Sequence, residues 1–160
     1  MPKIDIDKAP VRTGSAYPAP FHEPCEARHR VKLGDAAGLT QFGVNLMTLQ
    51  PGGWSSQRHW HTAEDEFVWV VEGEVVLVDN DGEHVLRAGD CAAFRAGDRN
   101  GHHLINRSDR DARLLEIGTR TADGVDGVDY PDIDMVIPVG SSDYHHRDGR
   151  PYAEDTRRKR

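Results

Sequence analysis

Two histidines and a glutamate in one short stretch are the residues of this chain best suited to metal chemistry. His59 and His61 are separated by a single residue, so on a β-strand their side chains point to the same face. Glu66 follows and begins an apolar run. Two imidazoles and a carboxylate form a mixed ligand set that suits iron, manganese, nickel, copper or zinc. The sequence therefore predicts one bound divalent transition metal ion per chain.

The position of the carboxylate depends on how the chain continues after His61. In an unbroken strand, alternation would place Asp65, and not Glu66, on the face of the histidines. Glu66 joins them only if a turn or bulge at residues 62–64 shifts the alternation. The alternation by itself leaves both carboxylates open as ligands.

The wider pattern resembles the first motif of the cupin superfamily, G-x5-H-x-H-x4-E-x6-G. All its fixed positions are present, as Gly53, His59, His61, Glu66 and Gly73. The resemblance implies that Glu66 is the ligand and that Asp65 belongs to a solvated acidic turn. It also implies an all-β fold, the double-stranded β-helix or jelly-roll barrel.

A second cupin motif, G-x5-P-x-G-x2-H-x3-N, is matched less closely, by Gly89, Gly97, His102 and Asn106. Arg95 stands where proline is usual, and two extra residues precede the histidine. The resemblance makes His102 the third imidazole ligand. Alternation puts His103 on the opposite face of the strand, which leaves it as the alternative.

The distribution of strand signals agrees with an all-β fold. Short apolar stretches separated by turn residues recur about every ten residues, and no stretch has a ten-residue helical period. We expect a proline-rich extended arm over residues 1–30, the barrel over residues 31–140, and a C-terminal extension with a basic tail over residues 141–160. As a whole, the chain resembles the stand-alone, single-domain cupins labelled sugar-phosphate isomerases.

Composition excludes several classes of partner. A formal net charge of -7 and a pI near 5.7 argue against nucleic acid and anionic membranes, which require a basic surface. No apolar run is long enough to span a membrane, and the first residues lack the apolar core of a signal peptide. We therefore expect a cytoplasmic protein. Its two cysteines cannot form a disulfide framework, and Cys91 is expected to be a buried small residue.

Further polar residues near the motifs suggest a small-molecule ligand. Alternation puts Gln57 in phase with the first histidines and Asn106 in phase with His102, while Arg95 and Arg99 could pair with an anion. Three imidazoles and one carboxylate leave coordination positions open on an ion that takes five or six ligands. These features predict a metal-dependent isomerase or lyase on a small polar or anionic metabolite. A metal-dependent dioxygenase and a non-catalytic binding protein are the alternatives.

The remaining expectations concern surfaces. Alternation places Trp54, Trp60 and Trp69 on the outside of the barrel, which predicts a homodimer that covers them, helped by the arm or the C-terminal segment. The aspartates between residues 123 and 134 are expected to form a solvated loop, because they lack the spacing of a calcium-binding loop. His145 and His146 are expected at the surface.

Overall fold

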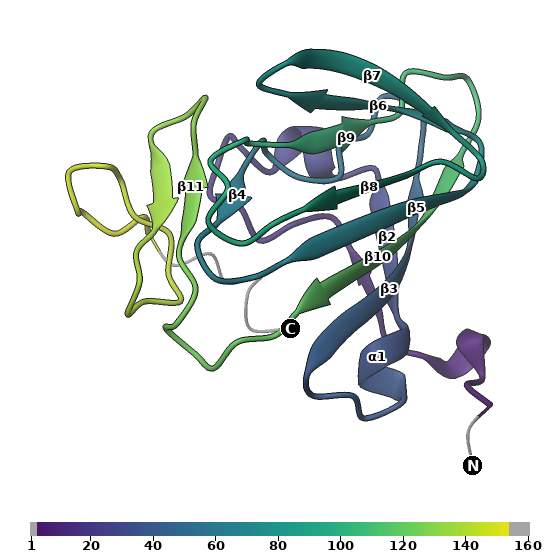
Figure 1. Ribbon diagram of the computed structural model, residues 1–160, viewed down its shortest axis with the longest axis horizontal. Coiled ribbons are helices and arrows are strands. Elements are labelled where there is room, and N and C mark those ends of the chain that lie inside the picture. The colour runs from purple at the N-terminus through teal and green to yellow at the C-terminus, as the bar shows by residue number, and fades with distance from the viewer. Residues whose placement is uncertain (1–2, 154–160) are drawn as a thin grey trace.

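A computed structural model of the protein describes residues 3–153 as an all-β fold with short helical turns (Figure 1). The helical segments are η1 (Ile6–Lys8), η2 (Glu23–Cys25) and α1 (Leu33–Ala36). The strands are β1 (Val11–Thr13), β2 (Arg28–Lys32), β3 (Phe42–Leu49), β4 (Trp60–His61), β5 (Glu66–Glu72), β6 (Glu74–Asp79), β7 (Gly82–Arg87), β8 (Cys91–Phe94), β9 (His103–Ile105), β10 (Ala112–Thr119), β11 (Val128–Tyr130) and β12 (Met135–Ile137). Within residues 3–153, no helix is long and apolar enough to cross a membrane.

Two antiparallel sheets face each other and enclose the main core (Figure 1). One has the strand order β1-β2-β3-β10-β5-β8, and the other has the order β7-β6-β9. The buried side chains between them are not aromatic: Met47, Leu49, Val68, Val70, Val75, Leu77, Leu104, Ala112 and Leu114. Every second residue of a strand faces the opposite sheet, which is why apolar alternation produces this core. The predicted jelly-roll barrel is confirmed.

Strand pairing places side chains in rows across the inner face of the six-stranded sheet. Successive rows towards one end of the barrel are Met47–Leu114–Val70, Asn45–Glu116–Val68 and Gly43–Gly118–Glu66. The lining thus changes from apolar to polar along the strands. The last row places two glycines beside the carboxylate, and a Cβ atom on Gly118 would make an ordinary van der Waals contact of 3.8 Å with Cγ of Glu66.

Part of the proline-rich N-terminal segment belongs to the sheet. Within the segment expected to form an extended arm, Val11–Thr13 forms the edge strand β1, which pairs with β2, and β2 pairs with β3. An edge strand tolerates a neighbouring proline because only one of its sides pairs with another strand. Pro10 directly precedes β1, and its carbonyl accepts the N–H of Lys32.

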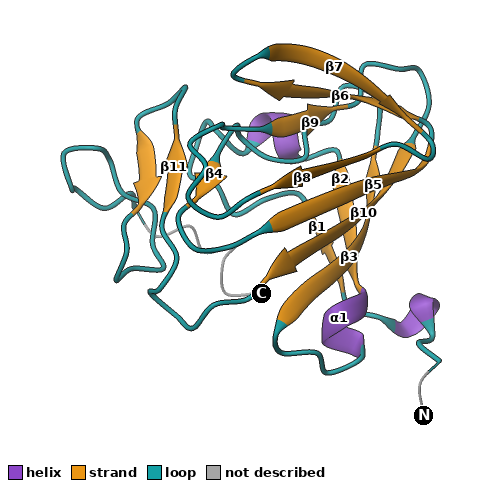
Figure 2. Cartoon of the chain, in the orientation of Figure 1, coloured by secondary structure: helices purple, strands orange, loops and turns teal. Residues whose placement is uncertain are grey.

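A smaller sheet of order β12-β11-β4 lies at one end of the barrel, among long loops (Figure 2). It carries a second core, whose buried members are Tyr17, Cys25, Val128, Tyr130 and Met135. Partly buried aromatic side chains surround them, including Phe21, Trp54, Tyr144 and Tyr152. Segments that precede β2 and segments that follow β10 therefore meet in one cluster rich in aromatic side chains.

The surface differs from expectation at three positions. Trp54 packs against the second core, and Trp60 lies 5.6 Å beneath the Arg99 guanidinium, so both are partly covered. Trp69 is 49% exposed, as predicted. Cys91 was expected to be buried but is exposed, because it pairs with Trp69 and shares its outward face. The buried cysteine is Cys25.

Candidate metal centre

A bend after His61 brings Glu66, and not Asp65, to the histidines. Strand β4 ends at His61, residues 62 and 63 form the bend, and β5 begins at Glu66. The shift in alternation that Glu66 required is therefore present. The side chain of Asp65 points elsewhere and accepts the Ala96 N–H at 2.7 Å.

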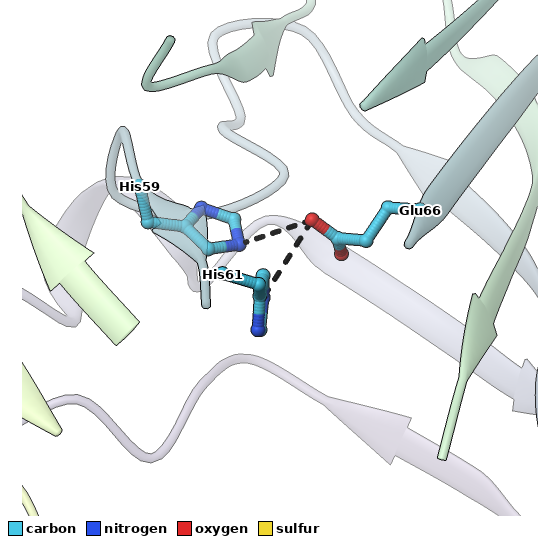
Figure 3. A group of neighbouring side chains, drawn as sticks. All are labelled: His59, His61 and Glu66. Atoms are coloured by element: carbon cyan, nitrogen blue, oxygen red, sulfur yellow. Dashed lines mark ion pairs between the residues drawn. The ribbon is translucent and has the colours of Figure 1, made fainter. Parts of the chain in front are cut away.

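One oxygen of Glu66 is the meeting point of three imidazoles. Its Oε2 lies 3.0 Å from Nε2 of His102 and 3.6 Å from Nε2 of both His59 and His61. Figure 3 shows Glu66 opposite His59 and His61, with dashed lines for the ion pairs between the carboxylate and the two rings. The backbones of His59 and His102 hydrogen-bond to each other in both directions, which fixes these two residues side by side.

The hydrogen bonds at the outer nitrogens determine which atoms face the centre. Nδ1 of His59 lies 2.9 Å from the Gln57 carbonyl, and Nδ1 of His61 lies 2.5 Å from Oδ2 of Asp126. Both partners accept, so each Nδ1 carries the proton and a neutral ring turns the lone pair of Nε2 towards Glu66. Lone pairs on imidazole nitrogens then face those of a carboxylate. A cation between them relieves this repulsion, so the donor set fits a divalent metal.

The third imidazole, His102, is held by packing. Its ring stacks on Phe94 with centroids 3.4 Å apart, and its Nδ1 is buried with no hydrogen-bond partner among the described residues. His103, the alternative ligand, points away from Glu66. Its Nδ1 contacts the Ser56 carbonyl, and its ring meets Trp54 edge-on. Of the two histidines, it is His102 that lies at the candidate centre.

Burial and charge act in opposite directions on these groups. Burial lowers the pKa of His59 to about 3, despite the nearby Glu66 carboxylate, so this ring is neutral at pH 7. Burial also tends to lower the pKa of His61, but the hydrogen bond to Asp126 and the charge of Glu66 raise it overall. Burial tends to raise the pKa of Glu66, yet the His102 hydrogen bond and the surrounding imidazoles bring it below its usual range. Glu66 therefore remains ionised.

Asp126 contacts the candidate site and was not identified from the sequence. We expected it in a solvated loop, but its side chain is mostly buried, and it also accepts the Ala63 N–H at 2.8 Å. It orients His61, as a carboxylate behind a metal-binding histidine does. No local spacing signals this contact, because 65 positions separate the two residues. Three other aspartates of this region are also paired, Asp129 with Arg147, Asp132 with Arg58 and Asp134 with His146.

A second possible metal group, His61, Glu64 and Asp126, shares one histidine with the first. Its carboxylates already have donors. Glu64 accepts the N–H and the hydroxyl of Thr121, and Asp126 accepts from His61 and Ala63. Oxygens satisfied in this way do not require a cation. We therefore take His59, His61, Glu66 and His102 as the candidate ligands.

A cavity of about 390 Å³ opens beside the imidazoles and Glu66. Besides these groups, its polar wall contains arginines, tyrosines and glutamates from distant segments: Arg12, Arg28, Arg30, Arg120, Tyr17, Tyr130, Tyr144, Glu64 and Glu116. Burial is the main cause that raises the pKa of Tyr17 and Tyr130, so both phenols keep their protons at neutral pH. The cavity therefore offers hydrogen-bond donors and positive charge close to the candidate centre.

The residues expected to contact a substrate lie elsewhere. Gln57 donates to the Phe21 carbonyl at 2.7 Å, and fully buried Asn106 donates to the carbonyls of Leu49 and Arg110. Arg95 is exposed, and Arg99 covers Trp60. None of the four lines the cavity. The alternation of side chains along a strand did not predict the partners of Gln57 and Asn106. Both side chains hydrogen-bond to backbone carbonyls of other segments.

Comparison with known proteins identifies the family. Residues 45–118 match the model of the cupin domain. A solved structure described as a sugar phosphate isomerase of the cupin superfamily, from Silicibacter pomeroyi DSS-3, is 47% identical, with a TM-score of 0.87 over 96% of this chain and 98% of that one. This chain belongs to the cupin superfamily. None of the curated proteins searched matches this cupin.

Two further structures show how far the likeness extends. One from Acidithiobacillus ferrooxidans ATCC 23270 is 29% identical to this cupin, with a TM-score of 0.68 over 74% of each chain. The polyketide cyclase RemF from Streptomyces resistomycificus is 17% identical, with a TM-score of 0.59 over 74% of this chain and 79% of that one. At that identity the likeness concerns the fold alone, and a shared fold does not imply a shared reaction.

Proposed function

We propose that this cupin is a metal-dependent enzyme that carries out isomerase-type or lyase-type chemistry on a small, oxygen-rich metabolite such as a sugar or sugar acid. The convergence of three imidazole nitrogens on one oxygen of Glu66, at the wall of an open cavity, is the observation that carries this proposal. The 47% identical relative described as a sugar phosphate isomerase supports the choice of reaction.

The four candidate ligands, His59, His61, Glu66 and His102, would hold one divalent transition ion. When bound, such an ion would polarise an oxygen of the substrate as a Lewis acid. Four protein ligands leave one or two positions of a five- or six-coordinate ion open, whereas a structural site is usually closed. All four candidate ligands line the cavity, so a substrate oxygen that enters it could reach an ion held there.

The wall of the cavity supplies the other groups that the reaction needs. The phenols of Tyr17 and Tyr130, which keep their protons, can donate hydrogen bonds to substrate oxygens. Glu116 forms a two-point ion pair with Arg30, with distances of 2.7 and 2.9 Å. The pair fixes this carboxylate in position. The wall contains two glutamates that are not candidate ligands, Glu64 and Glu116. Glu64 is the nearer of the two to Glu66 in sequence, and its side chain accepts hydrogen bonds from Thr121.

The metal site is tested with neighbouring carboxylates. Glu66→Gln removes the anionic ligand, while Asp65→Asn changes a carboxylate that only accepts a backbone N–H. We expect native purification followed by elemental analysis to find about one ion per wild-type chain and per Asp65→Asn chain, and much less in Glu66→Gln. Equal metal content in all three proteins would exclude this site. His146→Ala is a second control, because His146 pairs with Asp134 on the surface.

Turnover is tested separately. The metal-replete protein is incubated with pools of sugar phosphates, sugar acids and keto acids, with and without oxygen. We expect product formation that does not require oxygen. Turnover only in oxygen would replace this proposal with a dioxygenase. Saturable binding without product under either atmosphere would leave a small-molecule-binding cupin.

We also propose that the protein forms a homodimer through the outer face of the six-stranded sheet. Strand pairing aligns one apolar row across this face: Val11, Val31, Leu46, Leu115, Trp69 and Cys91. Trp69 and Val71 are each about half exposed. Monomeric proteins rarely expose apolar patches this extended, and a second copy can cover such a face by two-fold symmetry.

Light scattering at micromolar concentration tests the dimer. We expect the wild-type protein to have the mass of two chains and Trp69→Glu to have the mass of one, because a buried unpaired carboxylate opposes association. Val85→Glu is the control, since Val85 is equally exposed but lies on β7 of the other sheet. A monomeric wild-type protein would refute the dimer.

A further inference from the structure

Four arginines line the cavity, and three of them already have partners. Arg28 donates to the carbonyls of Gly14 and Ser55. Arg30 is paired with Glu116, and Arg120 with Asp35 and the Leu39 carbonyl. The fourth is Arg12. In the described part of the chain, its side chain has no hydrogen bond or ion pair, although the residue is only partly exposed.

Arg12 gives the cavity wall its excess of positive charge. In the strand pairing Arg12 lies directly opposite Arg30, so both side chains point to the inner face. Like charges at such a position are normally unfavourable. The cavity wall as a whole carries four arginines and only three glutamates, Glu64, Glu66 and Glu116, a difference of one positive charge. A divalent ion at the candidate centre would increase this excess.

We propose that Arg12 binds the anionic group of the substrate, a carboxylate or a phosphate, while other oxygens of the substrate approach the imidazoles and Glu66. A guanidinium forms two parallel hydrogen bonds to either anion, and the unpaired Arg12 has its donors available. This inference rests on the proposed function and names the substrate class, an anionic, oxygen-rich metabolite. It makes Arg12 a specificity-determining residue.

The topology indicates the shape of such a ligand. Arg12 lies on the edge strand β1 and Glu66 on β5, and the sheet places β2, β3 and β10 between them. Both residues line the same cavity, so a ligand that contacts both must extend across it. Arg12 also lies outside residues 45–118, which match the cupin domain. The strand added at the N-terminal side therefore supplies the charge recognition.

Calorimetric titration of the metal-loaded protein tests this assignment, with glucose 6-phosphate, gluconate and glucose as probes. We expect the two anions to bind the wild-type protein more tightly than glucose. Arg12→Gln should weaken binding of the preferred anion roughly 10- to 100-fold, because it removes charge-assisted hydrogen bonds. It should leave glucose binding and metal content unchanged, and Arg12→Lys should restore part of the affinity.

A matched control is Arg87→Gln, which changes an exposed arginine on β7 that pairs with Glu74. This variant should bind both anions like the wild type. Equal losses in Arg12→Gln and Arg87→Gln, or an unchanged anion affinity in Arg12→Gln, would overturn the assignment, as would an absence of anion preference in the wild type. Anion binding that depends on Arg12 without any turnover would retain the subsite and refute the enzyme. The stronger of the two anions decides between phosphate and carboxylate.

Discussion

The two cores of this cupin are built from different side chains and serve different purposes. The barrel core consists of aliphatic residues and methionine that alternate along strands between residues 47 and 114. The second core is aromatic, and its members come from residues 17–25 and from residue 128 onwards. Hydroxyl groups of this cluster line the cavity, whereas the buried barrel residues mostly do not. One core therefore supplies stability, and the other supplies a polar wall for a ligand.

The comparison is tested first where the largest effect is expected, at Leu114 in the barrel core. Leu114 is fully buried between both sheets. Leu114→Ala should lower the free energy of unfolding by about 2–5 kcal/mol, because it removes buried apolar contacts and leaves a cavity. Urea denaturation measures this. A loss below about 1 kcal/mol would show that the barrel core is not the main source of stability.

The contact between His61 and the loop that joins β10 to β11 is tested at Asp126. Asp126→Asn keeps the shape but weakens the acceptor of the His61 Nδ1–H. We expect metal affinity to fall roughly 10- to 100-fold, with unfolding of the metal-free protein little changed. Competition with a chromogenic chelator gives the affinity.

Asp132→Asn is the control for this measurement. Asp132 belongs to the same acidic region but pairs with Arg58. Equal metal affinity in the two variants and the wild type would show that Asp126 does not position His61.

The smallest effect is expected in the aromatic core, at Tyr130. Its ring stacks near His59 with centroids 5.7 Å apart, and its hydroxyl belongs to a group that includes Tyr17 and Tyr144. Tyr130→Phe keeps the ring, so we expect a stability loss of only about 0.5–1.5 kcal/mol. Ligand affinity should fall roughly 2- to 10-fold through the lost hydrogen bond.

Tyr152→Phe provides the comparison, because the Tyr152 hydroxyl donates to the Asp134 carbonyl and does not line the cavity. It should cost similar stability and leave ligand affinity unchanged. Equal losses of ligand affinity in Tyr130→Phe and Tyr152→Phe would show that the position of the Tyr130 hydroxyl at the cavity wall does not explain the loss.

The barrel and the histidine group were predictable because their signals are local. Alternation and turn residues define the strands, and the spacing of His59, His61 and Glu66 needs only one bend to place all three together. The exposed position of Cys91 could not be predicted from its small neighbours. It depends on the cross-strand partner, Trp69, and hence on the register.

The cavity wall could not be predicted for a different reason. Arg12, Tyr17 and Tyr130 lie in segments without a shared periodicity. They line one cavity because the sheet β12-β11-β4, which contains Tyr130, lies at the end of the barrel. Gln57 and Asn106 do not line the cavity, because in-phase positions on a strand do not reveal which carbonyl groups lie within reach. Long-range pairing decided these positions.

Strand β4 has a consequence for the order in which the protein folds. This strand contains only Trp60 and His61, and its strand partner is β11, at residues 128–130. During synthesis, the barrel strands up to β10 can emerge and pair before β11 exists. Closing so long a loop is entropically costly and slow. His61 should therefore reach its final position late, so a nascent chain that ends before β11 would already contain most of the barrel but no completed metal-binding group.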